Sequence, residues 1–322
     1  MLMGRVAAIC RSDKRGTKKQ AVSSAELVEN FGIEGDAHAG TGHRQVSLLA
    51  ASSIESMRTQ GLSDIHPGDF GENIIISDFD LATLGLGSHL RVGKDAEIII
   101  TQRGKVCHTR CAIFTQTGDC IMPREGIFAR ILRGGRVVVG DAIDIAQVVP
   151  PEMFQAVILT ISDKGSRGER ADTAGPAVAQ LLQQSLSAHI YGLEILPDDR
   201  KRIADRLRHY ADGHSIDLVV AVGGTGFSPR DVTPEAIRDV AERLTPGLDE
   251  AMRTASIRHT PHAILSRAVS GICGQTLLLS LPGSERAAVE NLQAILPALP
   301  HGLSKLRGDP EDCGSPPPSR DG

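Results

Sequence analysis

The feature that most constrains the fold of this chain is the alternation of strand-like and helix-like stretches in its second half. Apolar runs predict strands at 154–161, 192–196, 218–222 and 276–281, and helical spacing predicts helices at 174–187, 199–210, 233–242 and 284–296. Such alternation predicts an α/β domain, a three-layer, doubly wound, mostly parallel sheet. In these sheets ligands bind at the carboxyl ends of the strands.

The first half has a different character. Short apolar runs separated by glycine-containing turns predict a β-rich, barrel-like fold, with helices only at 50–60 and 126–133. Pro150-Pro151 marks the boundary, because two consecutive prolines continue neither a helix nor a central strand. We therefore expect domains at 1–148 and 152–306. The Pro-, Gly-, Asp- and Ser-rich stretch 307–322 predicts a disordered tail.

Composition excludes several classes of function. A net charge of −4 and 3% aromatic residues argue against nucleic acid as a partner, since nucleic-acid binders are usually basic and use aromatic stacking. No apolar run is long enough to span a membrane, and the beginning of the chain lacks the apolar core of a signal peptide. We expect a cytoplasmic protein whose six cysteines are mostly reduced.

A glycine-rich loop follows the predicted strand 218–222 directly. It comprises Gly223, Gly224, Thr225 and Gly226 and leads to a helix for which Thr233 is the expected N-cap and Pro234 the first residue. Glycines let backbone N–H groups approach a phosphate, and a helix N-terminus favours anions. The loop therefore indicates a site for a phosphorylated ligand, with a simple tight turn as the alternative.

Two further features support such a site. Arg230 can hold a phosphate oxygen and Asp231 a metal ion, although a surface ion pair would show the same pattern. The segments 162–176 and 282–284 follow two other predicted strands. Because the carboxyl ends of parallel strands share one edge of a sheet, the three segments are expected to converge on one pocket.

The second half resembles the bacterial molybdopterin adenylyltransferase family, which is related to the first domain of gephyrin. The resemblance runs from 156 to 303 and is carried by 160–163, 168–176, 196–199, 223–236, 246–248, 264–267 and 281–284. It implies transfer of AMP from ATP to molybdopterin with release of pyrophosphate. It also implies Mg²⁺ on the nucleotide phosphates and a homotrimer.

The resemblance assigns roles residue by residue. Asp231 would be the catalytic, Mg²⁺-associated carboxylate, and Asp198, with Asp199 beside it, the second important aspartate. The pocket would be formed by Ser162, Asp163, Asp172, Gly223, Gly224, Thr225, Gly226 and Arg230 and closed by Pro282, Gly283 and Ser284. One departure from the family pattern is Glu285, an acid after Ser284. It supports the alternative of a non-catalytic carrier or sensor of the cofactor.

A cysteine cluster lies in the first half. Cys107, His108, Cys111 and Cys120 could bind zinc, although two adjacent ligands fit one tetrahedral ion poorly. The cysteines could instead be packed in a β core. A third interpretation is a reactive thiol, because the cations Lys105, His108, Arg110 and Arg124 would favour the thiolate.

The first half also resembles a MOSC domain, the C-terminal domain of molybdenum cofactor sulfurases. Its motifs are 32–38, 43–48, 67–73, 84–87 and 101–107. The resemblance implies that Cys107 carries sulfur as a persulfide or ligates molybdenum. We find no pyridoxal-phosphate site, so a cysteine desulfurase partner would deliver the sulfur and a separate molybdate-insertion enzyme would supply the metal.

Other charged residues of the first half allow two interpretations. Asp36, His38 and Glu72 are compatible with ordinary turn and cap positions. Alternatively, His38, His43 and Arg44 shape an anion pocket for the pterin phosphate.

Overall fold

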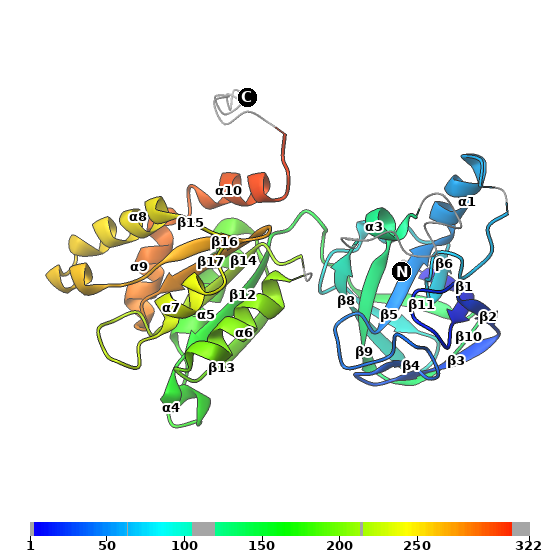
Figure 1. Ribbon diagram of the computed structural model, residues 1–322, viewed down its shortest axis with the longest axis horizontal. Helices are drawn as coiled ribbons and strands as arrows, with labels where there is room; N and C mark the ends of the chain where they lie inside the picture. Colours follow the sequence, from blue (N-terminus) through cyan, green and yellow to red (C-terminus); the bar gives the residue numbers. More distant parts are fainter. Residues whose placement is uncertain (1–2, 63, 105–119, 213–214, 311–322) are drawn as a thin grey trace. The chain divides into compact units, whose positions relative to one another are not determined.

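The chain folds into two compact units (Figure 1). The computed structural model describes residues 3–62, 64–104, 120–212 and 215–310. Contacts within the chain divide it into Met1–Met153 and Phe154–Gly322. This confirms the prediction of two domains. Among the helices of the described residues, none is long and apolar enough to span a bilayer.

The first unit contains a closed barrel of seven strands. In order around the barrel they are β11 (Ala142–Gln147), β7 (His89–Val92), β8 (Ala96–Arg103), β9 (Ile127–Arg133), β5 (Val46–Ala50), β6 (Ile74–Ser77) and β1 (Met3–Arg11), and pairing of β1 with β11 closes it. β2 (Gln20–Val22) pairs antiparallel with the end of β1. β10 (Gly135–Val138), β3 (Ser24–Val28) and β4 (Gly32–Ile33) form a separate small sheet. Alternating residues such as Ile98 and Ile100 fill the barrel core. The predicted barrel-like fold is confirmed.

Helix α1 (Ala51–Thr59) confirms the helix expected at 50–60, but the helix expected at 126–133 is wrong. That segment is strand β9, which pairs with β5 and β8. Ile127 and Ile131 point into the barrel core, whereas Phe128 packs in a second cluster on the other face. A short segment with apolar residues on both faces shows neither helical nor strand-like hydrophobic periodicity. Its secondary structure is then decided by the strands that it pairs with.

The second unit is built on a mostly parallel sheet. Its strands, in order, are β13 (His189–Leu196), β12 (Gln155–Ile161), β14 (Leu218–Val222), β17 (Thr276–Leu281), β16 (Ser270–Cys273) and β15 (Arg243–Leu244). The first four are parallel and the last two antiparallel. All four predicted strands are present. The pair β15 and β16, whose short segments carry little sequence signal, was not expected.

Helices cover both faces of this sheet (Figure 1). On one face, α5 (Ala174–Leu186), α8 (Pro246–Ile257), α9 (Glu285–Ile295) and α10 (Leu299–Leu306) contribute to a single core. On the other, α6 (Arg200–Ala211) and α7 (Thr233–Arg238) contact β14 and β17. The chain passes from β12 to β13, which lies on one side of β12 in the sheet. It then returns to β14, which lies on the other side of β12. The reversal places a topological switch point between β12 and β14.

Candidate functional site

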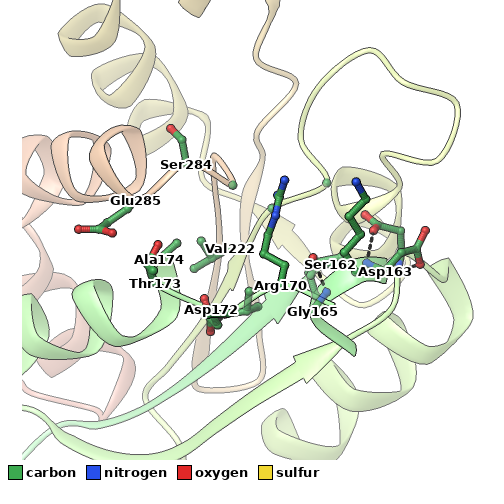
Figure 2. Close-up of a pocket in the computed structure, with 18 of the residues that line it drawn as sticks. Ser162, Asp163, Gly165, Arg170, Asp172, Thr173, Ala174, Val222, Ser284 and Glu285 are labelled. Atoms are coloured by element: carbon green, nitrogen blue, oxygen red, sulfur yellow. Dashed lines mark hydrogen bonds between the residues drawn. The ribbon is translucent and has the colours of Figure 1, made fainter. Parts of the chain in front are cut away.

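A hollow of about 660 Å³ opens at this switch point (Figure 2). The loops after β12, β13, β14 and β17 all contribute to it. The residues that line it are Thr160, Ile161, Ser162, Asp163, Lys164, Gly165, Arg170, Ala171, Asp172, Thr173, Ala174, Asp198, Val222, Gly223, Gly224, Arg230, Asp231, Gly283, Ser284 and Glu285. Segments far apart in the sequence thus converge on one space, as parallel strand ends require.

The glycine loop forms part of the wall. Gly223 and Gly224 have φ angles of +115° and +62°, which side chains rarely adopt. A Cβ atom on Gly223 would lie 2.4 Å from the Ile161 carbonyl oxygen, and one on Gly224 would lie 2.4 Å from Thr233 Oγ1. The backbone N–H of Gly223 donates to Leu281 O, at 2.9 Å. Among the described residues, the next three N–H groups of the loop find no acceptor and stay available to an anion.

The start of the following helix differs from expectation. Helix α7 begins at Thr233 with Val232 as the cap residue, so Thr233 is not the N-cap. Its side chain is fully buried, and its hydroxyl oxygen has no hydrogen-bond partner among the described residues. The hydroxyl instead packs beneath Gly224, so that a side chain at position 224 would clash with it. A cap pattern in the sequence cannot show whether the side chain turns toward the helix or the core.

Three of the carboxylates that line the hollow, Asp163, Asp198 and Asp231, belong to the loops after β12, β13 and β14. The backbone N–H of Asp163 donates to Asp198 Oδ2, at 2.9 Å, and that of Asp198 donates back to Asp163 Oδ1, at 3.1 Å. Asp231 Oδ2 accepts from the N–H of Ser228, at 3.0 Å. Asp199 lies outside the hollow and caps α6.

Electrostatics favour a cation beside these carboxylates. Burial raises the pKa of Asp198, and the negative charges of Asp163 and Asp231 raise it further. These effects exceed the lowering effects of the hydrogen bond from the Asp163 backbone N–H and of Arg230. A carboxyl group in this condition is stabilised by a bound positive ion. No group of three metal-binding side chains is present in the part of the chain that the structure describes. Mg²⁺ often takes only one or two protein carboxylates together with substrate phosphates, so Asp198 and Asp231 fit it.

Three cations face the same space. Lys164, Arg170 and Arg230 line the hollow, and none forms a direct ion pair with a described carboxylate. Figure 2 shows Arg170 extending between the loops. The alternative of an Arg230–Asp231 surface ion pair is therefore wrong. Lys164 and Arg170 were missed from the sequence because single cations in a polar loop carry no pattern of their own.

The remaining predicted residues mostly shape the walls. Ser162 accepts from the N–H of Gly165, at 3.0 Å, and caps the short helix α4 (Asp163–Ser166). Asp172 accepts from the Thr160 hydroxyl, at 2.7 Å, and from the N–H of Gly175, at 3.0 Å. Both oxygens of Asp172 are thus occupied in positioning the start of α5.

The turn after β17 is shared between two hollows. Gly283 and Ser284 line the first one, as does Glu285, the acid that departs from the family pattern. Pro282, like Thr225 and Gly226, borders a smaller hollow on the other side of the glycine loop. The structure therefore brings all but three of the predicted second-unit residues to one hollow and puts those three on its neighbour.

Arg267 belongs to the motif 264–267, and in the structure it holds the loop that follows β14. Its Nε donates to Gly226 O, at 2.8 Å, and Nη2 donates to Asp231 O. Nη1 donates to Glu235 Oε1, at 2.6 Å. One guanidinium thus ties both ends of the segment 226–231 to α7, and this segment carries Arg230 and Asp231.

The predicted cysteine site of the first unit lies mostly outside the described residues. Cys107, His108 and Cys111 are among the residues not described. Cys120 is buried and packs with Cys10 and Met122. Burial raises the pKa of the Cys10 thiol to about 12, with the charge of Glu72 as the next cause, so this thiol stays protonated.

Asp36 and Glu72 occupy turn positions in the first unit. Glu72 accepts from the N–H groups of Gly68 and Phe70, at 2.6 and 3.1 Å. Asp36 is buried against Lys19, with Nζ 2.6 Å from Oδ2. Burial raises the pKa of Asp36, but hydrogen bonds from His38 and Lys19 outweigh it and hold the pKa below its usual range.

The three residues suggested for an anion pocket have different partners. His38 Nδ1 lies 3.3 Å from Asp36 Oδ1. His43 Nε2 and Arg44 Nε instead meet at Gln102 Oε1, at 3.0 and 2.6 Å. Among the contacts of the described residues, His43 and Arg44 thus share the acceptor Gln102.

The fold and the hollow define the second unit as an α/β domain with a glycine loop and three cations around a hollow at its strand ends. Residues 157–301 match the family described as "Probable molybdopterin binding domain", and residues 35–144 match the MOSC domain. The chain belongs to the molybdopterin adenylyltransferase family through its second unit, which follows a MOSC domain.

The second half of the chain is similar to several individual proteins. The chain is 37% identical over 153 residues to a molybdopterin adenylyltransferase of Helicobacter pylori, a match covering 47% of this chain and 87% of the relative. It is 38% identical over 163 residues to gephyrin of Dictyostelium discoideum, over 48% of this chain and 23% of gephyrin. The chain thus spans about a quarter of gephyrin. The solved structure of MoaB, a molybdopterin biosynthesis enzyme from Thermus thermophilus, is 48% identical, covers 50% of this chain and 100% of its own, and has a TM-score of 0.47.

Proposed function

We propose that the second unit is a molybdopterin adenylyltransferase that takes part in molybdenum cofactor biosynthesis. An oxygen of the molybdopterin phosphate would form a bond to the α-phosphorus of ATP. The bond from that phosphorus to the β-phosphate would break, and pyrophosphate would leave. The observation that carries the proposal is the convergence of a glycine loop, three cations and five carboxyl side chains on one hollow. The similarity to named adenylyltransferases supports it.

The residues of the hollow suit a reaction between two polyanions. Lys164, Arg170 and Arg230 would reduce the repulsion between the two phosphorylated substrates. The free N–H group of Gly224, which lines this hollow, would fix a phosphate oxygen in position. Such transfer depends on positioning and charge neutralisation rather than on a covalent enzyme intermediate.

Asp198 and Asp231 would hold Mg²⁺ where it meets the nucleotide phosphates. The raised pKa of Asp198 supports a cation at this point. When bound, the ion would neutralise developing charge on the phosphate oxygens. Asp163, through its reciprocal hydrogen bonds with Asp198, would keep that carboxylate oriented.

The test is formation of adenylylated molybdopterin by the purified full chain. With ATP, Mg²⁺ and molybdopterin, mass spectrometry should detect the adduct, and pyrophosphate should appear in equal amount. Asp231→Asn should lower kcat by about a hundredfold or more, because a charge next to the reacting phosphates is lost. Asp239→Asn, at an exposed pair with Arg200 away from the hollow, is the matched control and should be unaffected.

A carrier or sensor of the cofactor is the second candidate. It is favoured by Glu285, whose carboxylate lines the same hollow as the three cations and would repel a second polyanion. Tight molybdopterin binding without any AMP transfer would establish the carrier and reject the enzyme. Glu285→Gln would then be expected to strengthen nucleotide binding.

For the first unit, we propose that Cys107 handles the sulfur or the molybdenum of the cofactor. The match to the MOSC domain supports this role. A cysteine desulfurase and a molybdate-insertion enzyme would be its partners, and the chain would act as a homotrimer. The adenylylated product would then pass to the insertion enzyme.

A further inference from the structure

Thr233 carries a buried hydroxyl group that the described chain leaves unused. The residue is 0% exposed, and its Oγ1 has no hydrogen-bond partner among the described residues. Its backbone, in contrast, is fixed, because its N–H donates to Gly224 O, at 3.2 Å. A buried donor without an acceptor is costly, so a hydroxyl group in this place needs an explanation.

The hydroxyl group lies beside a carboxylate oxygen of the candidate site. A Cβ atom on Gly224 would occupy a point that is 2.4 Å from Thr233 Oγ1 and 3.3 Å from Asp198 Oδ1. Both oxygen atoms therefore approach the same bare side of Gly224. The third atom near this point is Ile161 Cγ2, at 3.5 Å, which is apolar. Asp198 is thus the polar side chain that Thr233 meets across the glycine.

Asp198 Oδ1 also has no partner in the part of the chain that the structure describes. The other oxygen of this carboxylate, Oδ2, accepts from the N–H of Asp163, at 2.9 Å, whereas no described group donates to Oδ1. Asp198 and Gly224 both line the first hollow. An unused donor and an unused acceptor are therefore neighbours at the wall of the candidate site.

The charge of the carboxylate decides how much a bond between these two groups is worth. The hydrogen of a hydroxyl group can rotate toward an acceptor, and its bond to an ionised carboxylate is shorter and stronger than its bond to a neutral group. A divalent cation at Asp198 would keep the carboxylate ionised. The bound cation and the hydrogen bond would therefore favour each other.

We propose that Thr233 is a positioning residue whose hydroxyl group donates to Asp198 Oδ1 when a divalent cation is bound. The inference rests on the proposed function for the cation at Asp198. Thr233 would hold one oxygen of the carboxylate and the N–H of Asp163 the other, so that the carboxylate keeps a single orientation toward the ion. Carboxylates that bind metal ions are commonly held by hydrogen bonds in this way. In the ligand-free chain the same hydroxyl group lowers stability, because it has no partner.

Thr233→Val tests both parts of the inference, since it removes the hydroxyl group and keeps the shape of the side chain. The Tm of the ligand-free full chain should rise by about 2–4 °C. ATP is also titrated in Mg²⁺ and in EDTA, without molybdopterin, so that no transfer takes place. The gain in ATP affinity that Mg²⁺ confers should fall roughly three- to tenfold, the value of one hydrogen bond, while the affinity in EDTA stays unchanged. Thr233→Ser should keep the wild-type gain.

Thr276→Val is the matched control. Thr276 is buried at the first residue of β17, whereas the hollow lies at the other end of the parallel strands. Its hydroxyl group donates to Ile216 O, at 2.6 Å, so this group has the partner that the hydroxyl of Thr233 lacks. The control variant should lower the Tm and leave the Mg²⁺ gain unchanged.

A full Mg²⁺ gain in folded Thr233→Val overturns the inference. An equal loss of ATP affinity in Mg²⁺ and in EDTA also overturns it, because the change would then lie in the glycine loop rather than at the carboxylate. If Mg²⁺ confers no gain on the wild-type chain, the cation of the proposed function is rejected and the inference falls with it. If the wild-type chain forms no adenylylated product, the enzyme is rejected, but the Mg²⁺ gain still decides the role of Thr233.

Discussion

Asp163 and Asp198 are joined by two reciprocal hydrogen bonds, each from the backbone N–H of one residue to the carboxylate of the other. The contact connects the loops after β12 and β13 and fixes one carboxylate of the proposed cation site. It also places like charges together, which is unfavourable unless a cation is present. The relationship therefore links the stability of the second unit to the occupancy of its site.

A first prediction concerns pH. Because the pKa of Asp198 is raised in the folded protein, the fold holds this proton more tightly than the unfolded chain does. Stability is therefore lost as pH rises from the unfolded pKa through the folded one. Asp198→Asn should raise the Tm of the ligand-free protein near neutral pH, and the gain should vanish in acid. Thermal unfolding across pH measures this.

The same variant tests the cation. Added Mg²⁺ should raise the Tm of the wild-type chain in the presence of ATP but raise that of Asp198→Asn less. An equal rise in both proteins would remove Asp198 from the cation site.

A second prediction concerns Gly224. Its positive φ and the closeness of Thr233 Oγ1 mean that Gly224→Ala should destabilise the second unit by about 1–3 kcal/mol and weaken phosphate binding. Adding Thr233→Ala should recover part of the loss, because it removes the atom that the new methyl group meets. Denaturant unfolding of the single and double variants measures the coupling.

Gly247→Ala serves as the matched control for this experiment. A Cβ atom there meets nothing within 4 Å, and the residue lies in helix α8. The change should be neutral or stabilising by up to about 1 kcal/mol. A loss as large as that of Gly224→Ala would show that the loop geometry is not the cause.

A third prediction concerns Arg267 as a positioning residue. Arg267→Met removes the hydrogen bonds to Gly226 O and Asp231 O, so Asp231 should lose its fixed place. We expect kcat to fall by roughly ten- to a hundredfold with a smaller change in KM, since misplacement affects the transition state most. Steady-state kinetics of AMP transfer provide the measurement.

Two variants show whether the geometry of Arg267 matters. Arg267→Lys should not restore activity, because an ammonium group cannot span three acceptors as the guanidinium fork does. Arg238→Met removes another arginine near Glu235 that does not hold the loop, and it should leave kcat unchanged. Equal losses in both methionine variants would contradict the role of Arg267.

A fourth prediction concerns Cys107. Incubation with a cysteine desulfurase and cysteine should add the mass of sulfur to the chain, and peptide mapping should place it on Cys107. Cys107→Ser should abolish the addition. Cys10 is an internal control, because its buried, protonated thiol should stay unmodified. Equal labelling of the serine variant would reject the persulfide at this residue.

The sequence by itself determined the α/β alternation of the second half and the glycine loop at which we predicted a phosphorylated ligand. These features are local: strand Leu218–Val222 and the turn that follows it are encoded by neighbouring residues. The same local signal failed for Ile127–Arg133, where apolar residues on both faces left the period undefined and pairing with β5 and β8 produced a strand.

Only the tertiary structure decided which distant residues meet. Arg267 reaches the segment 226–231, and Asn291 meets Ser256, because the order of the strands and the packing of α8 and α9 bring them together. Lys164 and Arg170 joined the hollow for the same reason. Strand order and helix packing depend on contacts summed over the whole sheet, and no short stretch of sequence contains them.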